Sequence, residues 1–131
     1  MSAECAYDYA IVRVVPRVER GEMINVGVIV SCPDTEFLAA RIEVDEERLL
    51  AVDPALDLAT VRAHLSTIPA ICDGRPDAGP IAVLPARQRF YWLVSPRSTI
   101  IQTSPVHTGR TADPAAALER LMVSMVRRPE R

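Results

Sequence analysis

Several charged side chains and one side-chain amide lie close together between two apolar runs near the start of the chain, in the segment RVERGEMIN. Arginine forms bidentate pairs with carboxylates and phosphates, and ligand-binding residues often lie on loops held by a rigid sheet. We therefore predict a binding loop with Arg17, Arg20 and Asn25 as ligand-binding residues and Glu22 beside them. The competing interpretation is a solvated hairpin turn with a local ion pair, in which Asn25 bonds the backbone.

A second polar segment, SPVHTGRT, lies shortly before the last predicted helix. Ser104, Thr108 and Arg110 would suit a phosphate or carboxylate, because free N–H groups and the helix dipole converge at a helix start. No glycine-rich phosphate loop accompanies them. Alternatively, Ser104 and Thr108 satisfy turn backbone, and His107 is a surface or hydrogen-bonded polar residue.

The polar residues also allow an enzymatic hypothesis. Glu22 or His107 would act as acid or base on a phosphate- or carboxylate-bearing substrate, and Arg20 or Arg97 would hold the anion. Such a site requires these residues to converge in one pocket, so segments at opposite ends of the fold would exclude it. Because the sequence contains no recognisable catalytic motif, a non-enzymatic binding protein is the preferred hypothesis.

The three cysteines indicate neither a disulfide framework nor a zinc site, since Cys5, Cys32 and Cys72 are odd in number, widely spaced and without a CxxC pair. A thiol nucleophile would need Cys32 beside His107, and no sequence feature places them together. We predict no metal and no cofactor. No apolar run approaches membrane-spanning length and no leader pattern precedes the first strand, so the cytoplasm is expected.

Length and composition indicate one folded domain covering residues 1–131. Apolar residues make up 49% of the chain and charged residues 24%, an ordinary globular balance. All 15 basic residues are arginine, which we attribute to compositional bias more than to anion binding. A net charge of -2 disfavours nucleic-acid binding.

Three strands are predicted in the first third of the chain. Residues 6–15 form an almost continuous apolar run, typical of a strand covered on both faces, and Pro16 should end it. Gly21 in the loop that follows can take a positive φ. Residues 23–31 form the second strand of an antiparallel hairpin, with Ile24, Val26, Val28 and Val30 expected on one face. Residues 37–44 alternate cleanly and would form a partly exposed edge strand, through which a homodimer is plausible.

The remainder alternates helices with a second predicted hairpin. Asp45 should cap a helix through Ala51, and Asp53-Pro54 should start a longer helix that Pro69 kinks or ends. Residues 88–94 and 99–103 are predicted as paired strands, and Asp113-Pro114 should begin the last helix. The predicted fold class is α+β: a single domain with a mostly antiparallel sheet of about five strands and two or three helices on one face.

Three blocks of the sequence resemble the bacterial DUF3037 family, whose members are small uncharacterised proteins: YDYAIVRVVPRVERGEMINVGVIV, WLVSPRSTIIQTSPVHTG and DPAAALERLMVSMV. The positions that correspond to the recurrent family features are Arg13, Pro16, Glu19, Gly21, Glu22, Asn25, Gly27, Ser104, Pro105, Thr108 and Gly109. The resemblance implies no established activity. It also implies a HipA-like kinase as partner, since such genes are thought to lie often beside one for that kinase.

Together these observations predict an accessory or regulatory protein that binds a protein or an anionic ligand through the 17–25 and 104–110 segments. The alternative is the small enzyme described above.

Overall fold

Five antiparallel strands form the single sheet of the computed structural model, which describes residues 3–129. The strands are β1 (Cys5–Val14), β2 (Ile24–Cys32), β3 (Phe37–Ile42), β4 (Ile101–Thr103) and β5 (His107–Thr111). Their order is β3-β2-β1-β4, and β5 also pairs with β1. This arrangement confirms the predicted α+β class and the predicted first hairpin.

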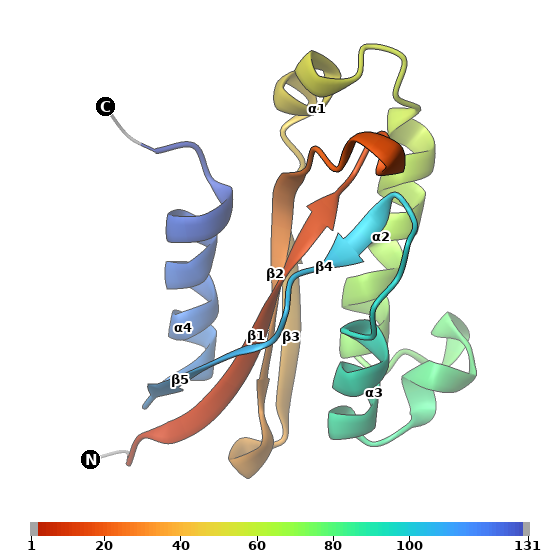
Figure 1. Cartoon of the computed structure of the whole chain (residues 1–131). Helices are drawn as coiled ribbons and strands as arrows, with labels where there is room; N and C mark the ends of the chain where they lie inside the picture. The colour runs from red at the N-terminus through yellow and green to blue at the C-terminus, as the bar shows by residue number, and fades with distance from the viewer. Residues whose placement is uncertain (1–2, 130–131) are drawn as a thin grey trace.

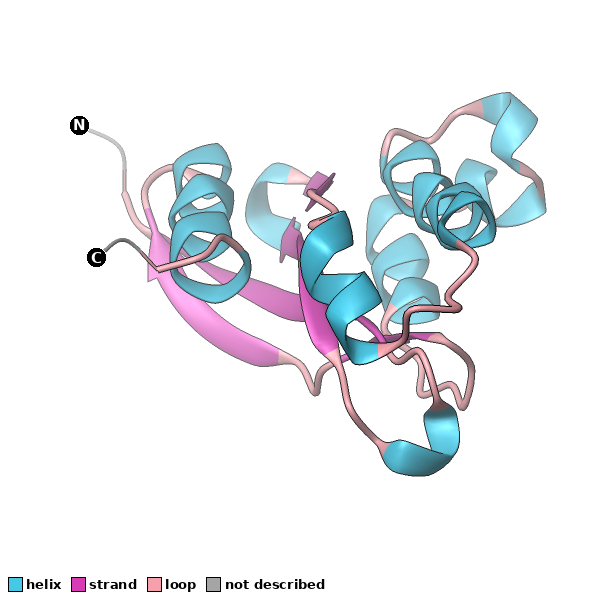
Figure 2. Ribbon diagram, turned by 90° about the horizontal axis from the view of Figure 1, so that it is seen from above, coloured by secondary structure: helices cyan, strands magenta, loops and turns pink. Residues whose placement is uncertain are grey.

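Helices cover both faces of the sheet. They are α1 (Glu46–Val52), α2 (Leu58–Cys72), α3 (Ala86–Leu93) and α4 (Pro114–Leu121), the last of which continues as a π-helical turn over Met122–Val126. In Figure 1, α4 lies on one side of the strands and α2 and α3 lie on the other. Figure 2, viewed from above, shows strands between α4 and the other helices. The helices α2 and α3 on one face agree with the expectation of two or three helices there. The helix α4 on the opposite face was not expected, and it packs there because β1 and β2 present apolar side chains to both faces.

A β-bulge in β2 explains why Val26 and Val28, two residues apart on one strand, pack into the cores on opposite faces of the sheet. Val12 pairs with Gly27 and Arg13 with Asn25, so Val26 is an extra residue on its strand. Val26 joins the core under α2 and α3, whereas Val28 belongs to the core under α4. The prediction of strict alternation along this strand was wrong for that reason.

The second predicted hairpin is not formed, because residues 86–93 are the helix α3. Helical spacing places Phe90 and Leu93 in the core and leaves Tyr91 and Trp92 exposed. Arg89 of this helix donates to the carbonyls of Ile71 and Cys72 and so caps the end of α2. Packing against α2 thus overrides the strand propensity of the aromatic run.

The segment expected to be a second polar loop is largely the edge strand β5. β4 and β5 follow one another along the same edge of β1, with a break at residues 104–106. The opposite edge of the sheet is β3, as predicted. A homodimer through that edge stays a prediction.

The helix boundaries also differ in part from expectation. Asp45 caps α1, and Asp113 and Pro114 begin α4, as predicted. α2 begins after Asp57, whose carboxylate accepts from the Thr60 amide, and not at Asp53. Pro69 lies inside α2, which continues to Cys72.

Ion pairs attach the segment that follows α4 to the residues between β3 and α1. Arg127 donates to Glu43 at 2.7 Å and to Glu119 at 2.5 Å, and Arg128 donates to Asp45 at 2.5 Å. The arginine hydrogen bonds hold the pKa values of Glu43 and Asp45 below their ordinary range. These contacts explain why the arginines that follow α4 point towards β3 and α1.

Candidate functional site

The first candidate site is the turn between β1 and β2, residues 17–25, which we call the hairpin end. Gly21 takes the left-handed conformation (φ 71°) that closes a short 3-10 turn, so the glycine is needed there as predicted. Arg17 lies 3.5 Å from the carboxylate of Asp53, and Arg20 pairs with Glu22 at 2.5 Å. Both arginines predicted to bind an anion therefore already have carboxylate partners.

Asn25 has a structural role at the base of the hairpin end. Its side-chain amide donates to the carbonyl of Met125 at 3.0 Å, and its oxygen accepts from Arg13 at 3.3 Å. These bonds join β2 to the π-helical turn and satisfy the amide. The contacts favour the interpretation of Asn25 as a scaffold residue that holds the hairpin end in place.

Most of the 104–110 segment belongs to the strand β5 and not to a loop. The buried Ser104 hydroxyl accepts from the Ile11 amide at 2.8 Å and donates to the Pro105 carbonyl. The His107 ring packs against Tyr9, with ring centroids 5.4 Å apart. Arg110 lies on the exposed surface, 4.0 Å from Glu4.

The two segments lie at opposite ends of β1, which separates the proposed catalytic residues. His107 pairs with Tyr9, whereas the hairpin end begins beyond Val14. Tyr9 and Val14 are about 16 Å apart at the usual rise of a strand. Glu22 and His107 therefore do not share a pocket, and the enzymatic hypothesis loses the convergence that it required.

A polar cluster that sequence reasoning missed lies where α3 crosses the sheet. Its members are Asp8, Ser31, Arg87, Tyr91 and Thr108, and we call it the Asp8 cluster. The Arg87 guanidinium donates to Asp8 at 2.5 Å, to Ser31 at 2.9 Å and to the Tyr91 hydroxyl at 3.1 Å. Thr108 donates to the other Asp8 oxygen at 2.8 Å. The register places Asp8 directly opposite both Ser31 and Thr108, a juxtaposition that depends on strand order.

Electrostatics in the Asp8 cluster favour a charged carboxylate. Burial of Asp8 raises its pKa, but the hydrogen bonds from Arg87 and Thr108 and the guanidinium charge lower it by more, so the net pKa is below the ordinary value. The guanidinium also stacks over the Tyr91 ring at 4.7 Å. Because its polar groups are paired with one another, the cluster anchors α3 to the sheet.

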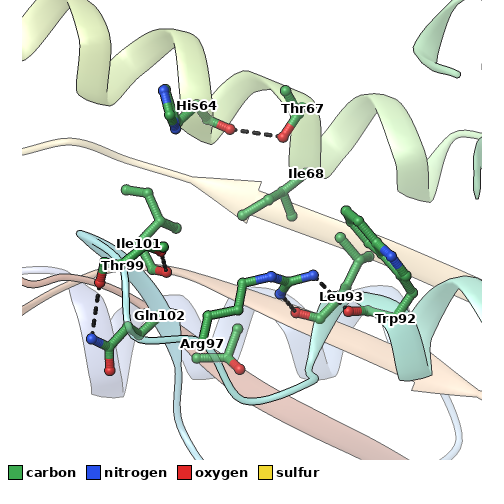
Figure 3. Close-up of a pocket in the computed structure, with 10 residues that line it drawn as sticks. His64, Thr67, Ile68, Trp92, Leu93, Arg97, Thr99, Ile101 and Gln102 are labelled. Atoms are coloured by element: carbon green, nitrogen blue, oxygen red, sulfur yellow. Dashed lines mark hydrogen bonds between the residues drawn. The ribbon is translucent and has the colours of Figure 1, made fainter.

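The second candidate site is a cavity of about 150 Å³ between α2, the end of α3 and β4, which we call the α3 cavity (Figure 3). It is lined by His64, Thr67, Ile68, Trp92, Leu93, Arg97, Thr99, Ile101, Gln102 and Thr103. Arg97 stacks over the Trp92 ring at 4.6 Å and donates to the Leu93 and Trp92 carbonyls at the end of α3. Arg97, one of the predicted anion-binding residues, thus lines a cavity.

Sequence reasoning missed the rest of this cavity. His64 and Trp92 were not among the predicted site residues. Their shared exposure on one side of the molecule depends on α3 being a helix packed on α2, which the sequence pattern did not predict. The signal that would have indicated α3 is the run of good helix formers from Ala86 to Arg89.

Within residues 3–129, no three His, Cys, Asp or Glu side chains gather closely enough to hold a metal ion. Over the same range no helix combines the length and the apolar character needed to cross a bilayer. Cys5 and Cys32 are free thiols with sulfur atoms 2.7 Å apart, and burial raises the pKa of Cys72 to about 12. Cys32 does not approach His107, because it lies on β2, on the far side of β1 from β5.

The fold and these sites define a small single-domain α+β protein whose sheet lies between two helical layers. The chain belongs to a family described as a protein of unknown function, DUF3037, whose model matches residues 9–126. No curated protein and no solved structure matches it. The match spans every strand and helix of the fold apart from the first residues of β1.

Proposed function

We propose that this protein is a non-enzymatic accessory or regulatory protein that binds another protein through the hairpin end. The observation that carries the proposal is a set of exposed apolar side chains on a firmly held, charged turn. Val18 and Met23 are 42% and 44% exposed within the hairpin end. Met125 lies in the π-helical turn after α4, where its carbonyl accepts a hydrogen bond from Asn25, and the residue is 41% exposed.

The setting of these side chains supports binding. Gly21 closes the turn, and the Arg17–Asp53 ion pair and the Asn25–Met125 hydrogen bond attach it to the rest of the fold. A preorganised surface loses less conformational entropy on association than a mobile one. Methionine adapts its shape to a partner surface, and the charged residues between the apolar ones would provide a polar rim.

A HipA-like kinase is the partner that the family resemblance suggests. The proposal is therefore tested by expressing this protein together with the HipA-like kinase of the same genome, purifying through a tag on the kinase and applying size-exclusion chromatography. Co-elution of the two chains is expected. Absence of co-elution would count against the kinase as partner.

Two variants locate the interface. Val18→Ser with Met23→Gln removes exposed apolar surface and is expected to weaken binding at least tenfold, which corresponds to about 1.4 kcal/mol. Val106→Ser is the matched control, because Val106 is 44% exposed but lies between β4 and β5. Equal loss of binding in both variants would exclude the hairpin end as the specific interface.

A further inference from the structure

We propose that the α3 cavity binds a small carboxylate with an apolar body, such as a short branched-chain acid. This proposal is independent of the hairpin-end interface. It rests on three features of this cavity: a guanidinium with unused N–H donors, an apolar floor and a polar rim.

Arg97 supplies the anion-binding edge. A guanidinium has five N–H donors in a planar fork. Its Nη1 atom donates to Leu93 and Ser95 and its Nη2 atom to Trp92, all to main-chain carbonyls. Within residues 3–129 the Nε–H of Arg97 has no hydrogen-bond partner. This N–H and the second Nη2–H lie on the side of the guanidinium away from the carbonyls, which Figure 3 shows facing Ile68.

Because Arg97 is held in position, the Nε–Nη2 edge of its guanidinium is preorganised for binding. Two carbonyl contacts of 2.9 and 2.8 Å and the stacking on Trp92 hold the guanidinium in place. The Nε–Nη2 edge matches the spacing of two carboxylate oxygens and allows a bidentate pair. No conformational change of Arg97 is then required for binding.

The floor of the cavity is apolar and suits the body of the ligand. Ile68 and Leu93 are almost fully buried, and Ile101 completes the floor. Trp92 forms one wall of the cavity and His64 and Thr67 lie across from it on α2 (Figure 3). An aliphatic chain would cover the floor and remove apolar surface from water.

The charge of the lining selects an anion. None of the ten lining residues is acidic, whereas Arg97 carries a positive charge. A carboxylate would therefore meet an attractive charge and no opposing one in the cavity. A cation of the same shape is disfavoured for the same reason.

The cavity volume favours a free small acid. A peptide C-terminus presents the same carboxylate group, but about 150 Å³ is below the roughly 300–1,000 Å³ of sites for drug-sized ligands. We therefore assign the site to the free acid. Comparing 3-methylbutanoate with N-acetylleucine, which mimics a chain end, separates these two sources.

Trp92 makes binding directly observable, because it is the single tryptophan in the chain. Titration with 3-methylbutanoate is expected to change its fluorescence saturably, with a dissociation constant on the order of 1 mM. The uncharged isostere 3-methylbutanamide should bind at least tenfold more weakly. No saturable change with the acid, equal binding of the amide, or tighter binding of N-acetylleucine would overturn the proposal.

Variants of the lining locate the site. Arg97→Lys keeps a positive charge but removes the bidentate edge, and we expect it to weaken binding at least tenfold. Since Arg97 also caps α3, Thr67→Phe provides a second variant, which fills the cavity from an exposed position of α2 and should abolish binding. Ala63→Phe is its control, on the same helix but outside the cavity. Unchanged affinity in both Arg97→Lys and Thr67→Phe would refute the site.

Discussion

Asp8→Asn tests whether the Asp8 cluster anchors α3 to the sheet. The substitution preserves the shape of the side chain but removes the negative charge of the carboxylate, which accepts hydrogen bonds from Arg87 and Thr108. Arg87 would keep its contacts to Ser31 and Tyr91. The variant therefore isolates the charge of one carboxylate from the packing around it.

The expected cost follows from the exposure of the pair. The Asp8 and Arg87 side chains are 19% and 31% exposed, between a surface pair and a fully buried one. Surface pairs contribute up to about 1 kcal/mol, whereas breaking a buried pair costs about 3–5 kcal/mol. We therefore expect Asp8→Asn to lower the free energy of unfolding by about 2 kcal/mol, or the melting temperature by roughly 8 °C.

The assay is urea denaturation followed by circular dichroism, with a matched pair as control. Asp77 pairs with Arg75 at 2.9 Å, but these side chains are 70% and 58% exposed. Asp77→Asn should leave the denaturation midpoint unchanged. A double-mutant cycle with Arg87→Gln should show coupling between Asp8 and Arg87 of at least 1 kcal/mol, a value on the order of that for charged hydrogen bonds.

The pH dependence provides an independent check of the same pair. Because the pKa of folded Asp8 is lowered, its stabilising contribution is fully present above the unfolded value of about 3.9 and is lost as pH falls through the folded pKa. The difference in stability between the wild-type protein and Asp8→Asn should therefore shrink below about pH 4. Equal effects of Asp8→Asn and Asp77→Asn, additive behaviour in the cycle, or a difference that persists in acid would refute the reasoning.

Two further substitutions and one chemical treatment test other parts of the fold. Gly27→Ala would place a Cβ atom 2.5 Å from the Arg41 carbonyl oxygen and is expected to cost about 3 kcal/mol in urea denaturation. Gly21→Ala, which meets open space but has a φ of +71°, should cost about 1 kcal/mol, and equal costs would contradict the steric explanation. Diamide, which accepts two hydrogens from paired thiols, should join Cys5 to Cys32 because their sulfur atoms are 2.7 Å apart. The hydrogen bond between the two thiols, with some burial, raises the pKa of Cys5, so the reaction should be faster at alkaline pH; intact mass and peptide mapping that show no such link would contradict this expectation.

Local signals in the sequence predicted much of the first hairpin and of the final helix. The apolar run of β1, the glycine at position 21 and the Asp113-Pro114 start of α4 each depend on neighbours close in the chain. Such signals are intrinsic to short segments, because steric limits, turn geometry and helix capping involve few residues. The α+β class and the edge position of β3 also followed from them.

Residues 86–103 show why local signals were insufficient elsewhere. The aromatic run from Phe90 to Trp92 has strand propensity, but packing on α2 and the Arg89 cap stabilise a helix. That change of element creates the α3 cavity and brings Arg87 to Asp8. Neither of these two features can be predicted unless residues 86–93 are known to form a helix that packs on α2.

The sequence by itself determined the opening hairpin, the caps of α1 and α4 and the conformation of Gly21, since these depend on interactions within a few residues. Only the tertiary structure decided that helices cover both faces, that the hairpin end and β5 lie apart, and that Arg97 lines a cavity. These features depend on strand order and helix packing, which join residues distant in the chain, such as Asp8 and Thr108. Periodicity along one segment carries no information about its distant partners.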